Sequence, residues 1–210
     1  MLIRLGVLSL IGLLAIGIPA AMASSVKEPS YTVVSESDGV ELRDYAPLIR
    51  AEPLVRGPYR DSVSDGFRVL AAYIFGGNTG SVEIAMAAPV GAEPAGTKIA
   101  MTAPVGAEAT ELGWLVSFVM PAEYTMATLP RPLDSRVSLR EVSAHRVAAL
   151  RFSGWAGEDT VAEKTTRLAA AMQKQGLVAL GEPVVAQYNP PWTPPFLRRN
   201  EILVTVSGPS

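Results

Sequence analysis

The order of predicted elements repeats once along the chain: strands, one amphipathic helix, then more strands. The strand-like segments are separated by turn signals, and several of them alternate apolar with polar residues. They are residues 31–36, 40–45, 49–55, 114–120, 137–142, 146–152, 184–188 and 201–206. Strands that flank a single helix in each half favour an α+β fold with both helices on one antiparallel sheet. The duplication suggests a barrel-like sheet with a pseudo-twofold relation between the halves.

Each predicted helix has one apolar face, formed by residues at helical spacing. In the first half these residues are Val63, Phe67, Leu70, Ala71 and Ile74. In the second half they are Val161, Thr165, Leu168, Ala169 and Met172. Glycines follow each helix, at Gly76-Gly77 and Gly176, and indicate where it stops.

The first residues predict a secretory signal peptide at 1–23. Arg4 gives a basic start, residues 5–18 are apolar but too short to span a bilayer comfortably, and Ala21-Met22-Ala23 matches a cleavage site. Cleavage after Ala23 would leave residues 24–210 as a single domain, periplasmic or secreted, with no stable membrane span. An uncleaved N-terminal anchor is the alternative.

Composition excludes several classes of function. The chain has no cysteine, so disulfides and cysteine ligation of zinc, iron–sulfur clusters or haem are ruled out. Its formal net charge is −2, and charges of both signs are scattered along the sequence. No nucleic-acid partner is therefore expected.

Few residues could carry catalysis. His145 is the only histidine, which excludes a two-histidine metal site, and a lone histidine beside a strand is more often structural than a ligand. No Gly-x-Ser-x-Gly elbow is present. Paired acids such as Glu83 and Glu201 could serve an enzyme, but the sequence assigns them no common geometry. We therefore expect a protein that is not an enzyme and has no metal-ligating side chains.

Residues 84–93 recur as residues 99–108 with a single difference, Ala87 against Thr102. Each apolar run ends in Ala-Pro-Val, and proline favours an extended residue before it, so both copies are predicted strands or strand–turn pieces. Met86 and Met101 occupy matching positions. A thioether can ligate haem iron, but filling the core is the favoured interpretation for both.

A proline-rich run occupies residues 188–202. Four prolines stiffen it, and it presents Trp192 and Phe196 between Tyr188 and the pair Arg198 and Arg199. Aromatic rings beside arginines suit a flat, apolar, anionic ligand, which would stack on the rings and pair its carboxylates with guanidinium groups. Alternatively, the run folds its aromatic side chains over one end of the sheet.

Three motifs, in this order, resemble the SOUL haem-binding family. They are Tyr73-Ile74-Phe75-Gly76-Gly77-Asn78, Lys98-Ile99-Ala100-Met101-Thr102-Ala103-Pro104-Val105, and the block from Tyr188 to Ile202. The resemblance runs from about Tyr31 to Val206. It implies a distorted antiparallel β-barrel of two pseudo-repeated halves flanked by two α-helices. It also implies non-covalent binding of haem or another tetrapyrrole as a possible cofactor.

In such relatives the proposed pocket lies between the first helix and the C-terminal proline loop. Mapped onto this chain, the pocket comprises Val63, Phe67, Arg68, Ala71 and Ile74 on the helix, and Tyr188, Trp192 and Phe196 on the loop. Basic residues of haem-binding relatives are replaced here by Ser64, Ala72 and Thr193. We therefore expect a mainly hydrophobic site with weak or no histidine ligation.

Together with the predicted signal peptide, the resemblance leads us to expect an exported, soluble protein that buffers or carries haem or a related tetrapyrrole. The alternative is general binding of apolar or amphipathic small molecules, because the fold also resembles effector-binding domains of multidrug regulators. Selective binding of cationic dyes over haem would favour this alternative.

Overall fold

The computed structural model of the protein describes residues 27–80, 97 and 99–208. The predicted signal peptide, the first copy of the repeat, Glu83 and Met86 lie outside the described residues. The eight strand-like segments predicted outside the repeat all form strands, with ends that shift by at most one residue, and both helices are present. In the second copy of the repeat only the part from Val105 onward is a strand. No helix in the described ranges is long and apolar enough to cross a membrane.

The elements in chain order are β1 (Tyr31–Ser37), β2 (Val40–Tyr45), β3 (Leu48–Val55), α1 (Tyr59–Ile74), β4 (Val105–Thr110), β5 (Gly113–Val119), β6 (Val137–Val142), β7 (His145–Phe152), α2 (Glu158–Lys174), β8 (Val178–Ala179), β9 (Val184–Gln187), the 3₁₀ helix η1 (Pro195–Leu197) and β10 (Asn200–Ser207).

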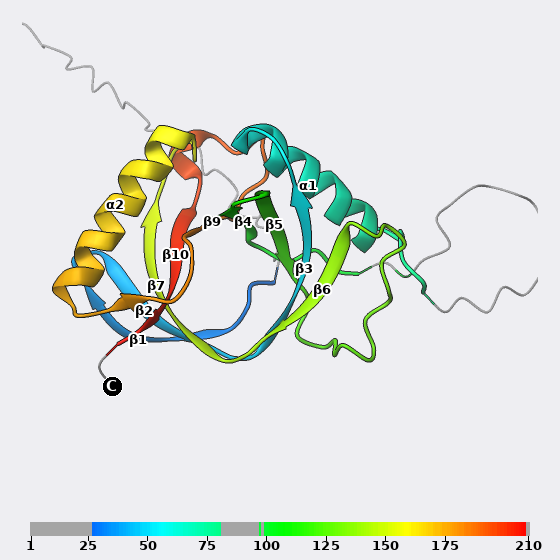
Figure 1. The fold of residues 1–210 in the computed structure, drawn as a ribbon, viewed down its shortest axis with the longest axis horizontal. Coiled ribbons are helices and arrows are strands. Elements are labelled where there is room, and N and C mark those ends of the chain that lie inside the picture. Colours follow the sequence, from blue (N-terminus) through cyan, green and yellow to red (C-terminus); the bar gives the residue numbers. More distant parts are fainter. Residues whose placement is uncertain (1–26, 81–96, 98, 209–210) are drawn as a thin grey trace, which may run out of the picture.

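The strands form one antiparallel sheet in the order β1-β2-β7-β10-β9-β4-β5-β3-β6, with β8 beside β10 (Figure 1). From β2 to β6 this order is palindromic: β2 corresponds to β6, β7 to β3, β10 to β5 and β9 to β4. Each half therefore contributes the same set of strands, as the repeated element order predicts. The pairing of β4 with β9 lies at the centre of this palindrome and divides the sheet into two halves, each of which includes one strand from the other half of the chain, β2 or β6.

The sheet is not closed into a barrel, so that part of the prediction is wrong. In the described residues β1 pairs only with β2, and β6 only with β3. The ends of the sheet are joined by the chain instead, because β2 continues into β3 and β6 into β7 across a corner. The register is unchanged there, since Tyr45 faces His145 and Leu48 faces Val142. The alternation of apolar and polar residues predicts where strands form, but it does not show which strands pair with one another at the edges of a sheet.

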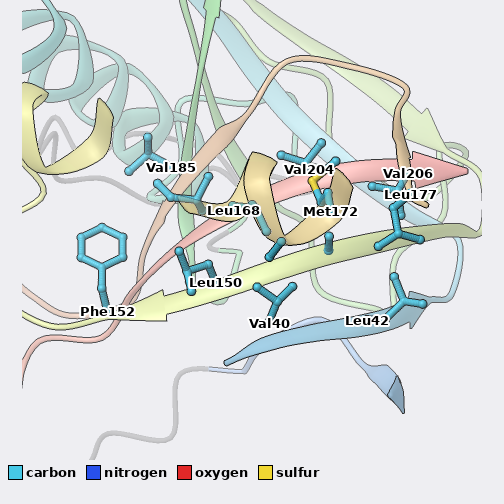
Figure 2. Close-up of a cluster of buried hydrophobic side chains, with 13 residues drawn as sticks. Val40, Leu42, Leu150, Phe152, Leu168, Met172, Leu177, Val185, Val204 and Val206 are labelled. Atoms are coloured by element: carbon cyan, nitrogen blue, oxygen red, sulfur yellow. The ribbon is translucent and has the colours of Figure 1, made fainter. Parts of the chain in front are cut away.

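Alternating side chains divide the strands between two faces of the curved sheet. On the outer face, α2 packs on β7 and β10, and α1 packs on β3, β5 and β6 (Figure 1). Each helix covers its own apolar core. Figure 2 shows the core under α2, where Leu168 and Met172 lie among Val40, Leu150 and Val204. The inner face is covered by neither helix.

The helix α1 packs through a face rotated slightly from the predicted one. Val63, Phe67 and Ala71 are only half-buried. The buried residues of α1 are Tyr59, Ser62, Gly66, Val69, Leu70, Tyr73 and Ile74. Gly66 explains the rotation, because a Cβ there would lie 2.5 Å from side-chain atoms of Val116 on β5. Close approach through a glycine leaves no signal in hydrophobic periodicity.

We predict that Gly66→Ala lowers the free energy of unfolding by about 1–3 kcal/mol, because the added methyl group overpacks the contact with Val116. Helix propensity alone predicts the opposite sign, a gain of roughly 1 kcal/mol. Urea denaturation measures the difference. Gly181→Ala is the control, since a Cβ at Gly181 meets no atom within 4 Å. A Gly66→Ala protein more stable than wild type would contradict the close packing of α1 on β5.

Candidate ligand-binding cavity

A cavity of about 360 Å³ lies on the inner face of the sheet, with walls from both halves. Its strand residues occupy alternate positions, while the residues between them belong largely to the apolar cores. The strand residues that line it are Tyr45, Leu48, Arg50, Gly106, Glu108, Ser117, Val119, Arg140, Val142, His145, Val147, Val184, Ala186, Leu203 and Thr205. The alternation that builds the cores thus also builds the cavity.

Small residues line the cavity where the two halves of the sheet meet. Gly106 on β4 lies directly opposite Ser117 on β5 and Ala186 on β9. A Cβ at Gly106 would lie 2.6 Å from Ser117 Oγ. Larger side chains at these positions would occupy the space between the halves, so the small residues help to keep the cavity open.

A wider hollow of about 820 Å³ adjoins the cavity at the corner between β2 and β3. The residues that line both are Pro29, Leu48, Val119, Val142, Ser143 and Ala144. The N-terminal residues 27–30 form part of its rim, held by a hydrogen bond of 3.0 Å from the Ala103 amide to the Lys27 carbonyl. A ligand too large for the cavity can therefore extend into the adjoining hollow.

Two arginines lie side by side in the cavity. Arg50 on β3 is directly opposite Arg140 on β6. Arg140 donates hydrogen bonds from Nε and Nη2 to Glu52 at 2.8 and 2.7 Å, so its charge is neutralised. Arg50 makes no salt bridge to any described residue, and its pKa is lowered by burial and by the charge of Arg140. Because like charges opposite each other are unfavourable, a ligand carboxylate would be stabilised here.

Acidic residues line the cavity as well. Glu108 lies on β4, and Glu182 lies in the loop before β9. Burial raises the pKa of Glu108, and the nearby charge of Arg50 offsets only part of this effect. The cavity therefore carries charges of both signs at its edges, between apolar walls.

A second set of charges on the inner face is neutralised within the protein. Arg43 on β2 reaches across β7 to Glu201 on β10, with Nη1–Oε2 and Nη2–Oε1 distances of 2.7 and 3.1 Å. The Tyr188 hydroxyl donates to Glu201 Oε2 at 2.6 Å, and Arg199 Nε donates to Oε1 at 3.0 Å. Burial would raise the pKa of Glu201, but the hydrogen bonds from Arg43 and Tyr188 and the charges of Arg43 and Arg199 hold it below the usual value.

The α1 residues predicted to line the pocket differ in how deeply they are buried. Ile74 is part of the core under α1, and the half-buried ring of Phe67 packs edge-on against Phe118, with centroids 5.5 Å apart. Val63 and Ala71 are half-buried, and Arg68 is exposed and pairs with Asp65. The helix therefore commits its largest apolar groups to the protein core.

The predicted loop residues are also separated from one another. Tyr188 belongs to the buried ion cluster, with Arg199 stacked 3.8 Å from its ring centroid. Trp192 and Phe196 are 83% and 77% exposed. None of the eight residues predicted for the pocket lines either hollow described above. The cavity residues Arg50, Arg140 and Glu108 were not predicted, because at single alternate strand positions they form no local motif.

Comparison with known proteins now identifies the family. A family model described as SOUL heme-binding protein matches residues 26–205. This chain belongs to the SOUL heme-binding protein family. No curated protein gives a match.

Solved structures resemble this SOUL-family chain in fold alone. The C-terminal domain of EcmrR is 11% identical with a TM-score of 0.57, over 85% of this chain and 98% of that one. A hydrolase from Listeria innocua is 12% identical with a TM-score of 0.52, over 83% of this chain and 94% of that one.

The SOUL-family motifs have structural roles in this chain. The buried side chain of Asn78 donates to the carbonyls of Tyr73 and Thr97, both at 2.8 Å, and so fixes the end of α1. Thr102 donates to the Val119 carbonyl. Met101 of the same motif is 36% exposed and lies in neither core, so its assignment as a core filler is wrong.

In the described part of this SOUL-family chain, no group of three His, Cys, Asp or Glu residues could hold a metal ion. The fit of haem therefore depends on the cavity. Its apolar walls, the free charge of Arg50 and the imidazole of His145 match the apolar rings, carboxylates and iron of that cofactor.

We predict that Glu201→Gln lowers the free energy of unfolding by about 3–5 kcal/mol at neutral pH, because it removes the fully buried carboxylate of the pair and leaves Arg43 only the partly exposed Glu41 as counter-charge. Chemical denaturation measures the change. Asp44→Asn is the control: it breaks two hydrogen bonds from Arg146 of similar length, but at a half-exposed site, so stability should hardly change. If the two variants lost the same free energy of unfolding, the buried pair of Arg43 and Glu201 would contribute no more to stability than the half-exposed pair of Asp44 and Arg146.

The lowered pKa of Glu201 predicts that the loss of stability in Glu201→Gln depends on pH. Because the pKa of Glu201 is lowered on folding, its carboxylate stabilises the protein above the usual value of 4.5, and this stabilisation is lost as the pH falls through the lower folded pKa. The difference in unfolding free energy between wild type and Glu201→Gln should therefore be constant near neutrality and shrink below about pH 4.5. A difference that grows on acidification would contradict the direction of the shift.

Proposed function

We propose that the protein binds haem or a related tetrapyrrole non-covalently in the inner cavity, as an exported buffer or carrier and not as an enzyme. The observation that carries the proposal is Arg50, a partly buried cation without a salt bridge to any described residue, in the cavity of a SOUL-family chain. A tetrapyrrole with carboxylate side chains would supply the missing counter-charge.

The lining of the cavity suits such a ligand in polarity. Leu48, Val119, Val142, Val147 and Leu203 supply apolar surface from both halves of the sheet. A flat apolar ring system would bury its faces against them, which stabilises the complex in proportion to the area removed from water. Because the cavity opens into the hollow at the corner, the ligand need not fit within 360 Å³.

This location differs from the pocket expected between α1 and the proline loop. The inner cavity lies on the face of the sheet that α1 does not cover, and it presents Arg50 with Arg140, whereas Arg68 on α1 is paired with Asp65. The two locations make different predictions for substitutions, so one titration series distinguishes them.

The test is a haemin titration followed by the Soret absorbance. We expect saturable one-to-one binding to wild type and a loss of affinity of roughly ten- to a hundredfold in Arg50→Gln, since a charge-assisted hydrogen bond contributes about 1.5–3 kcal/mol. Arg136→Gln is the matched control, because Arg136 is exposed, pairs with Asp134 and lies outside the cavity. Its affinity should equal that of wild type.

Trp192→Ser completes the series by testing the pocket on the loop. Loss of haemin affinity in Trp192→Ser with no change in Arg50→Gln would contradict the inner cavity and favour the pocket between α1 and the loop. Absence of saturable haemin binding to wild type would contradict tetrapyrrole binding altogether.

A second candidate function is binding of lipophilic cations, favoured by Glu108 and Glu182 in the same cavity. A cationic dye such as rhodamine 6G would pair with these carboxylates, and fluorescence anisotropy measures its binding. If this is the function, the dye binds more tightly than haemin, Glu108→Gln weakens the dye, and Arg50→Gln does not. The opposite ranking of the two ligands supports the tetrapyrrole.

A further inference from the structure

His145 is held in a fixed orientation at the rim of the cavity. It begins β7 directly after the corner and lies opposite Tyr45 of β2. The two rings stack, with centroids 5.6 Å apart and planes 15° apart. Tyr45 is itself buried and packs against Tyr31 at 5.1 Å. The imidazole is therefore supported on one side by a ring that cannot easily move.

A backbone carbonyl determines which imidazole nitrogen carries the proton. His145 Nδ1 lies 2.8 Å from the Ser143 carbonyl oxygen. A carbonyl can only accept, so Nδ1 donates its hydrogen and the lone pair of the neutral ring is on Nε2. Burial lowers the pKa of His145, and the charges of Arg50 and Arg140 lower it further, against the opposing effect of the Ser143 hydrogen bond. Metal-binding histidines commonly donate the hydrogen of one ring nitrogen to a carbonyl oxygen in this way while the other nitrogen binds the metal.

The other nitrogen remains available. Within the described residues Nε2 has no hydrogen-bond partner, and it is not among the buried side-chain atoms that lack one. It is therefore accessible from solvent, on a ring that lines the same cavity as Arg50 and Arg140. The lone pair on Nε2 and the guanidinium group of Arg50 are suited to an iron porphyrin with carboxylates, since the lone pair can bind the iron and Arg50 can pair with an acid.

We propose that His145 Nε2 is a protein ligand to the iron when haem occupies the inner cavity. This inference rests on the proposed function, to which it adds the metal ligand. It also differs from the weak or absent histidine ligation expected from the sequence, because sheet pairing places His145 beside Tyr45 and in the cavity, which its position in the chain does not reveal.

The test compares haemin with metal-free protoporphyrin IX in wild type, His145→Phe and His145→Ala. His145→Phe keeps a ring for Tyr45 to stack on but removes the lone pair, and His145→Ala leaves room for free imidazole. We expect both variants to change the Soret position and the ferric EPR spectrum and to lose at least about tenfold in haemin affinity. Added imidazole should restore the wild-type spectrum in His145→Ala. Protoporphyrin IX affinity, measured by fluorescence, should change less than about twofold, because it offers no iron to bind.

Each outcome is decisive for one of the two proposals. A wild-type haemin spectrum in both variants overturns iron ligation by His145 and leaves tetrapyrrole binding in place. Equal losses for haemin and protoporphyrin IX assign His145 a packing role and also overturn ligation. If wild type binds neither tetrapyrrole, the proposed function fails, and the metal ligand fails with it.

Discussion

The buried ion pair between Arg43 and Glu201 is the interaction on which the inner face of the sheet depends. Removing two charges from water is costly unless geometry and further hydrogen bonds compensate for it. Here Glu41 also accepts from Arg43, and Tyr188 and Arg199 donate to Glu201. These contacts hold β2, β10 and the base of the proline loop in one arrangement. Glu28 accepts from Arg199 at 3.0 Å and adds the N-terminal segment to the same cluster.

The two faces of the sheet divide a structural role from the proposed binding role. The outer face is apolar and covered by α1 and α2, so it supplies the hydrophobic stabilisation of both halves. The inner face carries the charged residues, some paired within the protein and some lining the cavity. Successive side chains of a strand point to opposite faces of the sheet. A substitution at one position therefore affects either the apolar core or the cavity, while a substitution at the next position affects the other.

Local patterns in the sequence were sufficient to predict the strands, the helices and the two-half organisation. They did not predict the open sheet, because hydrophobic alternation within a strand does not reveal that, among the described residues, β1 and β6 each pair on one side only. They missed the packing of Gly66 on Val116 for the same reason that they missed Arg50 opposite Arg140: each is a contact between positions far apart in the chain. The conspicuous motifs were informative about family, but in the structure Asn78, Tyr188 and Glu201 support the fold.

The palindromic strand order extends to two of the charges on the inner face. Arg43 on β2 and Arg140 on β6 lie on corresponding strands, and each is neutralised by a glutamate of the chain. The glutamates themselves lie on strands that do not correspond, Glu201 on β10 and Glu52 on β3. The internal symmetry of the molecule therefore holds for its backbone but not for its electrostatics, and the two walls of the cavity present different charges to whatever lies between them.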